Sequence, residues 1–172
     1  MEGFKTQRLN VRNWADDIAD PARRCALERS LAEILTPHVL SHLPDPLALH
    51  GGTDAIGHWI TERARESDVL LIETRDADRL IGLLLLAPGD MTNDERDRHL
   101  GYLLAESAWG HGYATELVTG LIGALEPSIH SRLIGGVGTD NPASAHVLKK
   151  TGFTRDAKLS TPDTDVFVRN LR

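Results

Sequence analysis

The spacing of apolar residues changes twice within the first 65 residues. Residues 4–14 alternate between apolar and polar side chains, which predicts a half-buried strand. Residues 18–35 and 53–65 repeat apolar residues at helical spacing, so we expect two helices, separated by a proline-rich irregular passage at 37–46. The buried faces are expected to contain Cys25, Leu27, Leu31, Ile34 and Leu35 in the first helix, and Ile56, Trp59 and Ile60 in the second.

Short apolar runs occupy the middle of the chain. Residues 68–75 and 79–88 are joined by a turn-like DAD segment, which predicts adjacent antiparallel strands. The second run is apolar almost throughout, so both of its faces are expected to be covered. A polar, acidic connection at 89–98 is expected to be solvated, and a further strand follows at 99–106.

The next segments predict a parallel crossover. Apolar residues at positions 114, 117, 118, 121, 122 and 125 follow the i, i+3, i+4 pattern of a helix, which Pro127 ends, and a strand follows at 132–139. Parallel strands need such a crossover connection, whereas the preceding strands form a meander. We therefore predict an α+β fold with a mixed, mostly antiparallel central sheet flanked by helices on both faces.

The segment DNPASAHVLKKTGF carries the punctuation of a short helix. Asn141 is a favoured N-cap, Pro142 suits the first helical position, and Gly152 lies just past the end. Two final strands are predicted at 153–159 and 165–171.

Composition narrows the class of protein. A chain of 172 residues suits a single domain, residues 1–172, with a sizeable core. The net charge of −6 argues against nucleic-acid binding through a basic face, and no apolar run approaches the length that spans a membrane. Cys25 is the only cysteine, which excludes an internal disulfide and favours a cytoplasmic setting.

Two glycines, Gly110 and Gly112, stand directly before the most regular predicted helix. A helix N-terminus presents unpaired N–H groups and partial positive charge, so it suits a phosphate, and glycines allow close approach. The segment contains no P-loop, and G-H-G-Y-A-T departs from the dinucleotide fingerprint. A tight turn without a ligand remains the alternative from spacing alone.

Three motifs together resemble the GNAT acetyltransferase superfamily, within it the RimJ/RimL-like branch of ribosomal-protein N-terminal acetyltransferases. TQRLNVRNWADD is similar to the opening strand of that branch, with Val11 where Leu is usual. GYLLAESAWGHGYATE is similar to its central motif, and TDNPASAHVLKKTGF to its N-x-x-S-x-x-V-L-x-K-x-G-F segment. The resemblance covers nearly the whole chain and implies the GNAT-like acyl-CoA N-acyltransferase fold.

The resemblance implies that acetyl-CoA is bound as co-substrate. Backbone N–H groups of residues 109–115 would hold its pyrophosphate, and the preceding strand would diverge at a bulge to pair with the pantetheine arm. One N–H of that strand would polarise the thioester carbonyl. The implied cofactor-binding residues are Leu103, Leu104, Ala105, Trp109, Gly110, His111, Gly112, Tyr113, Ala114, Thr115, Asn141 and Ser144.

The catalytic residues are less sharply indicated. Ser144 is a candidate to protonate the departing thiolate, because the tyrosine that many branches use is replaced by Leu148. Glu106 is the leading candidate for the general base, while His111, Glu73 and a water chain remain open. Two further interpretations concern Cys25, expected to fill the core, and the pair His38 and His42, from which we expect no metal site.

The acceptor implied by the resemblance is a primary amine, on a protein N-terminus or a small molecule, which attacks the thioester directly in a ternary complex. An α-amine with a pKa near 8 needs less help from a base than a lysine-type amine near 10.4. The alternative is a non-catalytic acyl-CoA sensor. We expect a monomer or homodimer.

Overall fold

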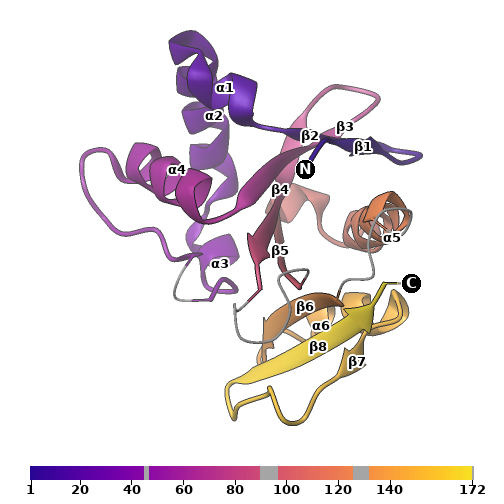
Figure 1. Ribbon diagram of the computed structural model, residues 1–172. Coiled ribbons are helices and arrows are strands. Elements are labelled where there is room, and N and C mark those ends of the chain that lie inside the picture. Colours follow the sequence, from indigo (N-terminus) through magenta and orange to yellow (C-terminus); the bar gives the residue numbers. More distant parts are fainter. Residues whose placement is uncertain (45–46, 90–96, 126–131, 172) are drawn as a thin grey trace. The chain divides into compact units, whose positions relative to one another are not determined.

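The computed structural model describes residues 1–44, 47–89, 97–125 and 132–171 (Figure 1). The chain divides into two structural units. The first unit comprises Met1–Leu85 and Tyr102–Trp109, and the second comprises Leu86–Gly101 and Gly110–Arg172. Two strands, β4 (Leu80–Pro88) and β5 (Arg98–Leu104), have residues in both units.

The strands of the first unit form an antiparallel meander. β1 (Phe4–Lys5) pairs with β2 (Leu9–Asn13), β2 pairs with β3 (Asp68–Thr74), and β4 and β5 follow in the sheet order. The predicted strands at 68–75 and 79–88 are confirmed, and β4 is buried along most of its length as expected.

The prediction of one continuous strand at residues 4–14 is wrong, because this segment forms two strands, β1 and β2. The chain folds back on itself, so that Phe4 lies opposite Val11 in an antiparallel hairpin. Thr6 causes the reversal, because its N–H donates to the Leu9 carbonyl at 2.9 Å and its hydroxyl accepts from the Leu9 N–H at 3.0 Å. Leu9 and Val11 are nevertheless buried, as their alternation predicts.

The predicted helix at 18–35 is two helices, α1 (Ala15–Ala19) and α2 (Pro21–Ile34). Asp20 separates them because its carboxylate caps α2 by accepting from the Arg23 N–H at 2.9 Å, with Pro21 at the first helical position. The expectation that Cys25 fills the core is wrong, since its side chain is exposed. It lies two residues before the buried Leu27, and residues so spaced face different sides of a helix.

The remaining helices of the first unit complete its core. α4 (Ala55–Glu66) buries Trp59 and Ile60 as predicted. The passage expected to be irregular contains a short helix, α3 (Pro37–Leu40), which begins at a proline and is capped by Thr36. Its Val39 belongs to one apolar cluster with Leu31, Trp59 and Leu103.

The second unit contains the parallel crossover. α5 (Tyr113–Leu125) joins β5 to β6 (Arg132–Gly138), and these strands pair in parallel at Arg98↔Leu133 and His99↔Ile134. β6 also pairs along all seven of its residues with antiparallel β8 (Thr164–Asn170), which is flanked by β7 (Thr154–Arg155). The predicted mixed sheet is confirmed (Figure 1).

Helix α6 (Pro142–Lys150) packs against β6, β8 and α5. The helix approaches β6 closely at Gly135, where an added Cβ would lie 2.9 Å from Leu148 Cδ1, so that side chain would have to shift. Leu148 is buried, so the position where other branches use a tyrosine has a packing role here. β7 ends earlier than predicted because Asp156 starts a turn, in which its carboxylate accepts from the Lys158 N–H at 2.8 Å.

Two sequence predictions involve residues outside the described ranges. Pro127, expected to end the crossover helix, is one, and most of the acidic connection, residues 90–96, is the other. Asp97, the last acid of that connection, is described and is buried rather than solvated. None of the helices in the described ranges combines the length and hydropathy of a bilayer-spanning segment.

Candidate active site

The glycine segment is an open loop. In the second unit, Gly110 and Gly112 have φ angles of +75° and +79°, in the left-handed region that favours glycine. A Cβ at Gly110 would meet no atom within 4 Å, and α5 begins directly after the loop at Tyr113. The first N–H groups of such a helix have no intrahelical acceptor, so the loop and helix start fit a phosphate group.

The end of β5 belongs to the first unit. Leu103 and Leu104 have buried side chains, and the Ala105 N–H donates to the Ile81 carbonyl at 2.8 Å. The Trp109 indole N–H donates to the Leu104 carbonyl at 2.8 Å, although the Trp109 side chain is 37% exposed. Trp109 therefore fixes the start of the loop to the last residue of the strand.

The start of α6 places two predicted residues together. The Asn141 side chain accepts from the Ser144 backbone N–H at 3.1 Å, as an N-cap does. Ser144 is half-buried, and its hydroxyl has no hydrogen-bond partner within the described ranges. Its O–H is accordingly available to a ligand, because the cap uses only its main chain.

Glu106, the candidate base, lies just after β5 in a short 3₁₀ turn, Glu106–Ala108. Thr36 donates its hydroxyl to Glu106 Oε1 at 2.5 Å, and His38 Nδ1 lies 3.0 Å from Glu106 Oε2. These two hydrogen bonds, that from Thr36 first, lower the pKa of Glu106 below its ordinary value. The His38 ring also meets Trp109 edge-on, with ring centroids 4.9 Å apart.

Removing the Thr36 hydroxyl should raise the pKa of Glu106. In Thr36→Val we expect this pKa to return toward its ordinary value of 4.5, because the largest stabiliser of the carboxylate is lost. Carbon-detected NMR titration measures it, with Thr36→Ser as the control that keeps the hydroxyl. Since the folded pKa is depressed, the stability contributed by these bonds is present above the unfolded pKa and is lost as the pH falls through the folded one. An unchanged pKa in Thr36→Val would contradict this assignment.

The other two candidate bases, Glu73 and His111, do not belong to this cluster of Thr36, His38 and Glu106. Glu73 accepts from Arg12 Nη2 at 2.8 Å and from Asn10 Nδ2 at 3.1 Å, and hydrogen bonds from Arg12 to Asp17 and then to Glu73 raise the pKa of the arginine. This ion-pair network gives Glu73 a structural partner on β2. His111 is exposed in the loop, and its ring centroid lies 6.0 Å from that of Tyr113.

No pattern in the sequence indicates that Thr36 and His38 would meet Glu106. Glu106 lies 70 positions after Thr36 and 68 after His38, and the contact depends on the packing of α3. One related signal in the sequence is the four-residue spacing of His38 and His42, a spacing that can also pair metal ligands on a helix. Their ring centroids lie 5.4 Å apart.

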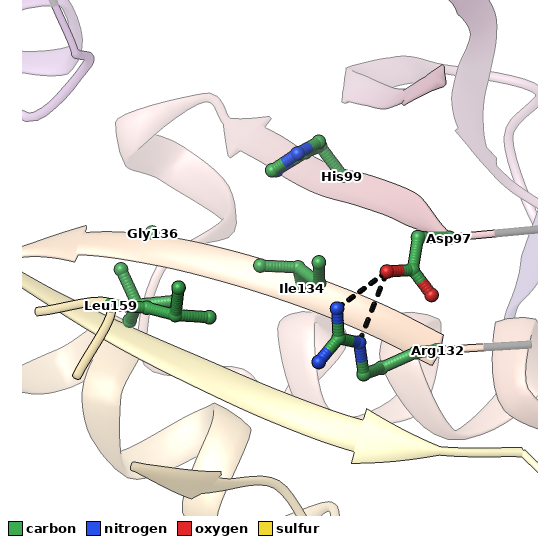
Figure 2. Close-up of a pocket in the computed structure, with 7 residues that line it drawn as sticks. Asp97, His99, Arg132, Ile134, Gly136 and Leu159 are labelled. Atoms are coloured by element: carbon green, nitrogen blue, oxygen red, sulfur yellow. Dashed lines mark hydrogen bonds and ion pairs between the residues drawn. The ribbon is translucent and has the colours of Figure 1, made fainter. Parts of the chain in front are cut away.

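A pocket of about 210 Å³ lies within the second unit, between β5, β6, β8 and the segment before β8. Figure 2 shows the Asp97 carboxylate facing the Arg132 guanidinium at one end of this pocket. Arg132 Nη2 lies 2.6 Å and Nε 3.1 Å from the same carboxylate oxygen. His99 and apolar side chains complete the lining, which comprises Asp97, His99, Arg132, Ile134, Gly136, Leu159 and Val166.

Breaking this ion pair should destabilise the fold. The Asp97 side chain is only 6% exposed, so Arg132→Met would leave a buried carboxylate without its cation. We expect a loss of about 2 kcal/mol in the free energy of unfolding, less than for a fully buried pair because Arg132 is partly exposed. Urea denaturation measures it. Arg155→Met, which breaks the more exposed pair with Asp165, is the matched control and should cost less than about 1 kcal/mol. Equal losses in both variants would contradict the prediction.

Comparison with known proteins extends these observations. The model of the acetyltransferase (GNAT) domain family matches residues 8–154. No protein with a curated description matches the chain.

Solved structures with the same fold are numerous. RimL, a ribosomal L7/L12 α-N-protein acetyltransferase in complex with coenzyme A, is 20% identical, with a TM-score of 0.71 over 99% of this chain and 98% of its own. A spermidine N-acetyltransferase from Vibrio cholerae, with coenzyme A and spermine, is 15% identical, with a TM-score of 0.69 over 95% of each chain.

A ribosomal-protein-S5-alanine acetyltransferase from Vibrio fischeri is 14% identical, with a TM-score of 0.73 over 99% of this chain and 97% of its own. At these identities the likeness shows the fold alone, and it confirms the predicted GNAT-like α+β class. Since the family model spans most of the sequence, the chain belongs to the GNAT acetyltransferase family and is an acetyl-CoA-dependent acyltransferase.

Proposed function

We propose that this protein transfers the acetyl group of acetyl-CoA to a primary amine by direct attack within a ternary complex. The observation that carries the proposal is the open loop with left-handed Gly110 and Gly112 immediately before α5. Backbone N–H groups of residues 109–115 would hold the pyrophosphate, and residues 103–105 would lie along the pantetheine arm.

The acceptor class we favour is an α-amine, as in the RimJ/RimL-like branch. RimL and the Vibrio fischeri neighbour are both named for acetylation of ribosomal proteins, whereas the Vibrio cholerae neighbour is named for spermidine. Deprotonating an α-amine at pH 7 costs about 1 kcal/mol, against about 4–5 kcal/mol for a lysine-type amine. Positioning of both substrates can then supply much of the rate.

Two side chains would act on the reacting groups. The Ser144 hydroxyl, free of protein partners in the described ranges, would donate to the departing thiolate, and Asn141 would hold the start of α6 against the cofactor. Glu106 would contribute to deprotonation of the attacking amine.

An acceptor screen tests the proposal. Release of free coenzyme A from acetyl-CoA is measured with peptides bearing free N-termini, the same peptides with blocked N-termini, spermidine, aminoglycosides and amino acids. We expect turnover with free N-termini and none with blocked ones. Binding of acetyl-CoA without turnover across the whole panel would instead support a non-catalytic acyl-CoA sensor and reject the transferase.

A further inference from the structure

A histidine and a glutamate form a linked pair at the end of β5. His38 Nδ1 lies 3.0 Å from Glu106 Oε2, and Thr36 donates to the other oxygen, Oε1, at 2.5 Å. Both oxygens of Glu106 are thus engaged, and their hydrogen bonds lower its pKa, which makes Glu106 a weaker proton acceptor.

The same contact defines which nitrogen of His38 is available. An ionised carboxylate only accepts hydrogen bonds, so Nδ1 must carry the proton that bridges to Glu106. In the neutral ring Nε2 then holds the lone pair. The His38 side chain is 58% exposed, which makes this nitrogen reachable for a substrate.

The packing of α3 places this pair beside the segment assigned to the pantetheine arm. Val39 belongs to the same buried cluster as Leu103, and Ala105 packs against that cluster. Trp109, which bonds the Leu104 carbonyl, meets the His38 ring edge-on. The pair therefore lies within the first unit at the end of β5.

We propose that His38 is the general base of the acetyl transfer and that Glu106 is the positioning residue that holds its ring in the proton-accepting tautomer. The inference rests on the amine acetylation proposed above. It moves the role of base from Glu106, the candidate from the sequence, to a residue that the glutamate orients.

The step balances as follows. His38 Nε2 takes one proton from the ammonium group of the acceptor, and the neutral amine attacks the thioester carbonyl carbon, forming the C–N bond. The C–S bond then breaks and its electron pair leaves with sulfur. The second proton of the attacking nitrogen passes to that thiolate, giving the amide and free coenzyme A. The imidazolium returns its proton to solvent.

A purely structural role explains the pair poorly. Glu106 is 43% exposed in its side chain, and exposed ion pairs of this kind contribute little to stability. Among the described contacts, Glu106 and His42 are the titratable groups that face His38, and the third ring is the neutral Trp109.

Kinetics of matched variants tests the inference. With an accepted α-amine at pH 7, His38→Gln should lower kcat at least about 100-fold, the lower range for a general base, with acetyl-CoA affinity by calorimetry unchanged. Exogenous imidazole should restore part of the rate of His38→Ala. The deficit should shrink at pH 9.5, where an α-amine of pKa near 8 is already neutral. His58→Gln, an exposed histidine on α4, is the control and should keep the wild-type rate.

Glu106 requires its own variant. Glu106→Gln should lower kcat about 10-fold, and in the double variant with His38→Gln it should add almost nothing, because both residues act on one proton transfer. A wild-type rate in His38→Gln, absence of imidazole rescue, or equal deficits at pH 7 and 9.5 would overturn the role of His38 while leaving the transferase intact. Absence of wild-type turnover across the acceptor panel would reject both.

Discussion

Replacing Gly112 with valine is expected to weaken the binding of coenzyme A so far that almost none is bound. Gly112 has a φ of +79°, a conformation that β-branched residues rarely adopt, and its side-chain position lies in the loop proposed to hold the pyrophosphate. Loss of two charge-assisted hydrogen bonds from the loop, about 4 kcal/mol in total, corresponds to an affinity about 1000-fold weaker. Isothermal titration calorimetry with coenzyme A measures the effect.

Backbone strain must be separated from obstruction of the ligand. Gly52 also has a positive φ, +151°, and a Cβ there would meet no atom within 4 Å. Gly52→Val therefore introduces a comparable backbone conflict outside the loop and should leave coenzyme A affinity unchanged. Circular dichroism should show that both variants are folded. If Gly112→Val binds coenzyme A with wild-type affinity, the glycines serve only the turn and the proposed cofactor site is wrong.

Local patterns predicted the elements of the fold well. The apolar runs of β3 and β4 and the spacing of α5 specified their structures directly, because one face or both faces must be buried. Asn141, Pro142 and Gly152 predicted the ends of α6 for the same reason, since each satisfies a local backbone requirement.

Sequence patterns failed where a short-range hydrogen bond interrupts a regular run, and where a residue pairs with a distant one. Thr6 turns the first predicted strand into a hairpin, and Asp20 divides the first predicted helix. Asp97 is the last residue of an acidic run that is predicted to be solvated. It is buried instead, because Arg132, 35 residues later, faces it. That pairing depends on the parallel contact of β5 and β6, which no local pattern encodes.

In the candidate site too, local motifs predict some of the residues, and contacts between distant segments determine the others. The glycine loop and the Asn141 cap are local motifs, so their residues could be named in advance. The link from Thr36 and His38 to Glu106 spans two segments about 70 residues apart and forms only because α3 packs on the apolar cluster of the first unit. The sequence thus indicated where a cofactor would lie more sharply than which side chains would move protons.

Ser144→Ala is expected to lower kcat about 100-fold while changing KM for acetyl-CoA less than about 3-fold. A hydroxyl that donates to the departing thiolate acts mainly after binding, so its loss should be seen in kcat, with a size typical of general acid catalysis. The fold should be unaffected, because the bond from Ser144 to Asn141 uses the backbone N–H, which alanine retains. Stopped-flow measurement of thiol release determines both constants.

Two controls distinguish a proton donor from a helix-cap residue. Ser144→Thr keeps a hydroxyl at this position and should recover most of the rate. Asn141→Asp keeps a side chain that caps α6, so it tests whether the helix cap by itself sets the rate. A thiol of ordinary pKa near 8.5 leaves as the stable thiolate in alkaline solution, so the deficit of Ser144→Ala should be smaller at pH 9.5 than at pH 7. Wild-type kcat in Ser144→Ala at both pH values would limit Ser144 to a structural position in α6, and solvent would then have to protonate the leaving thiolate.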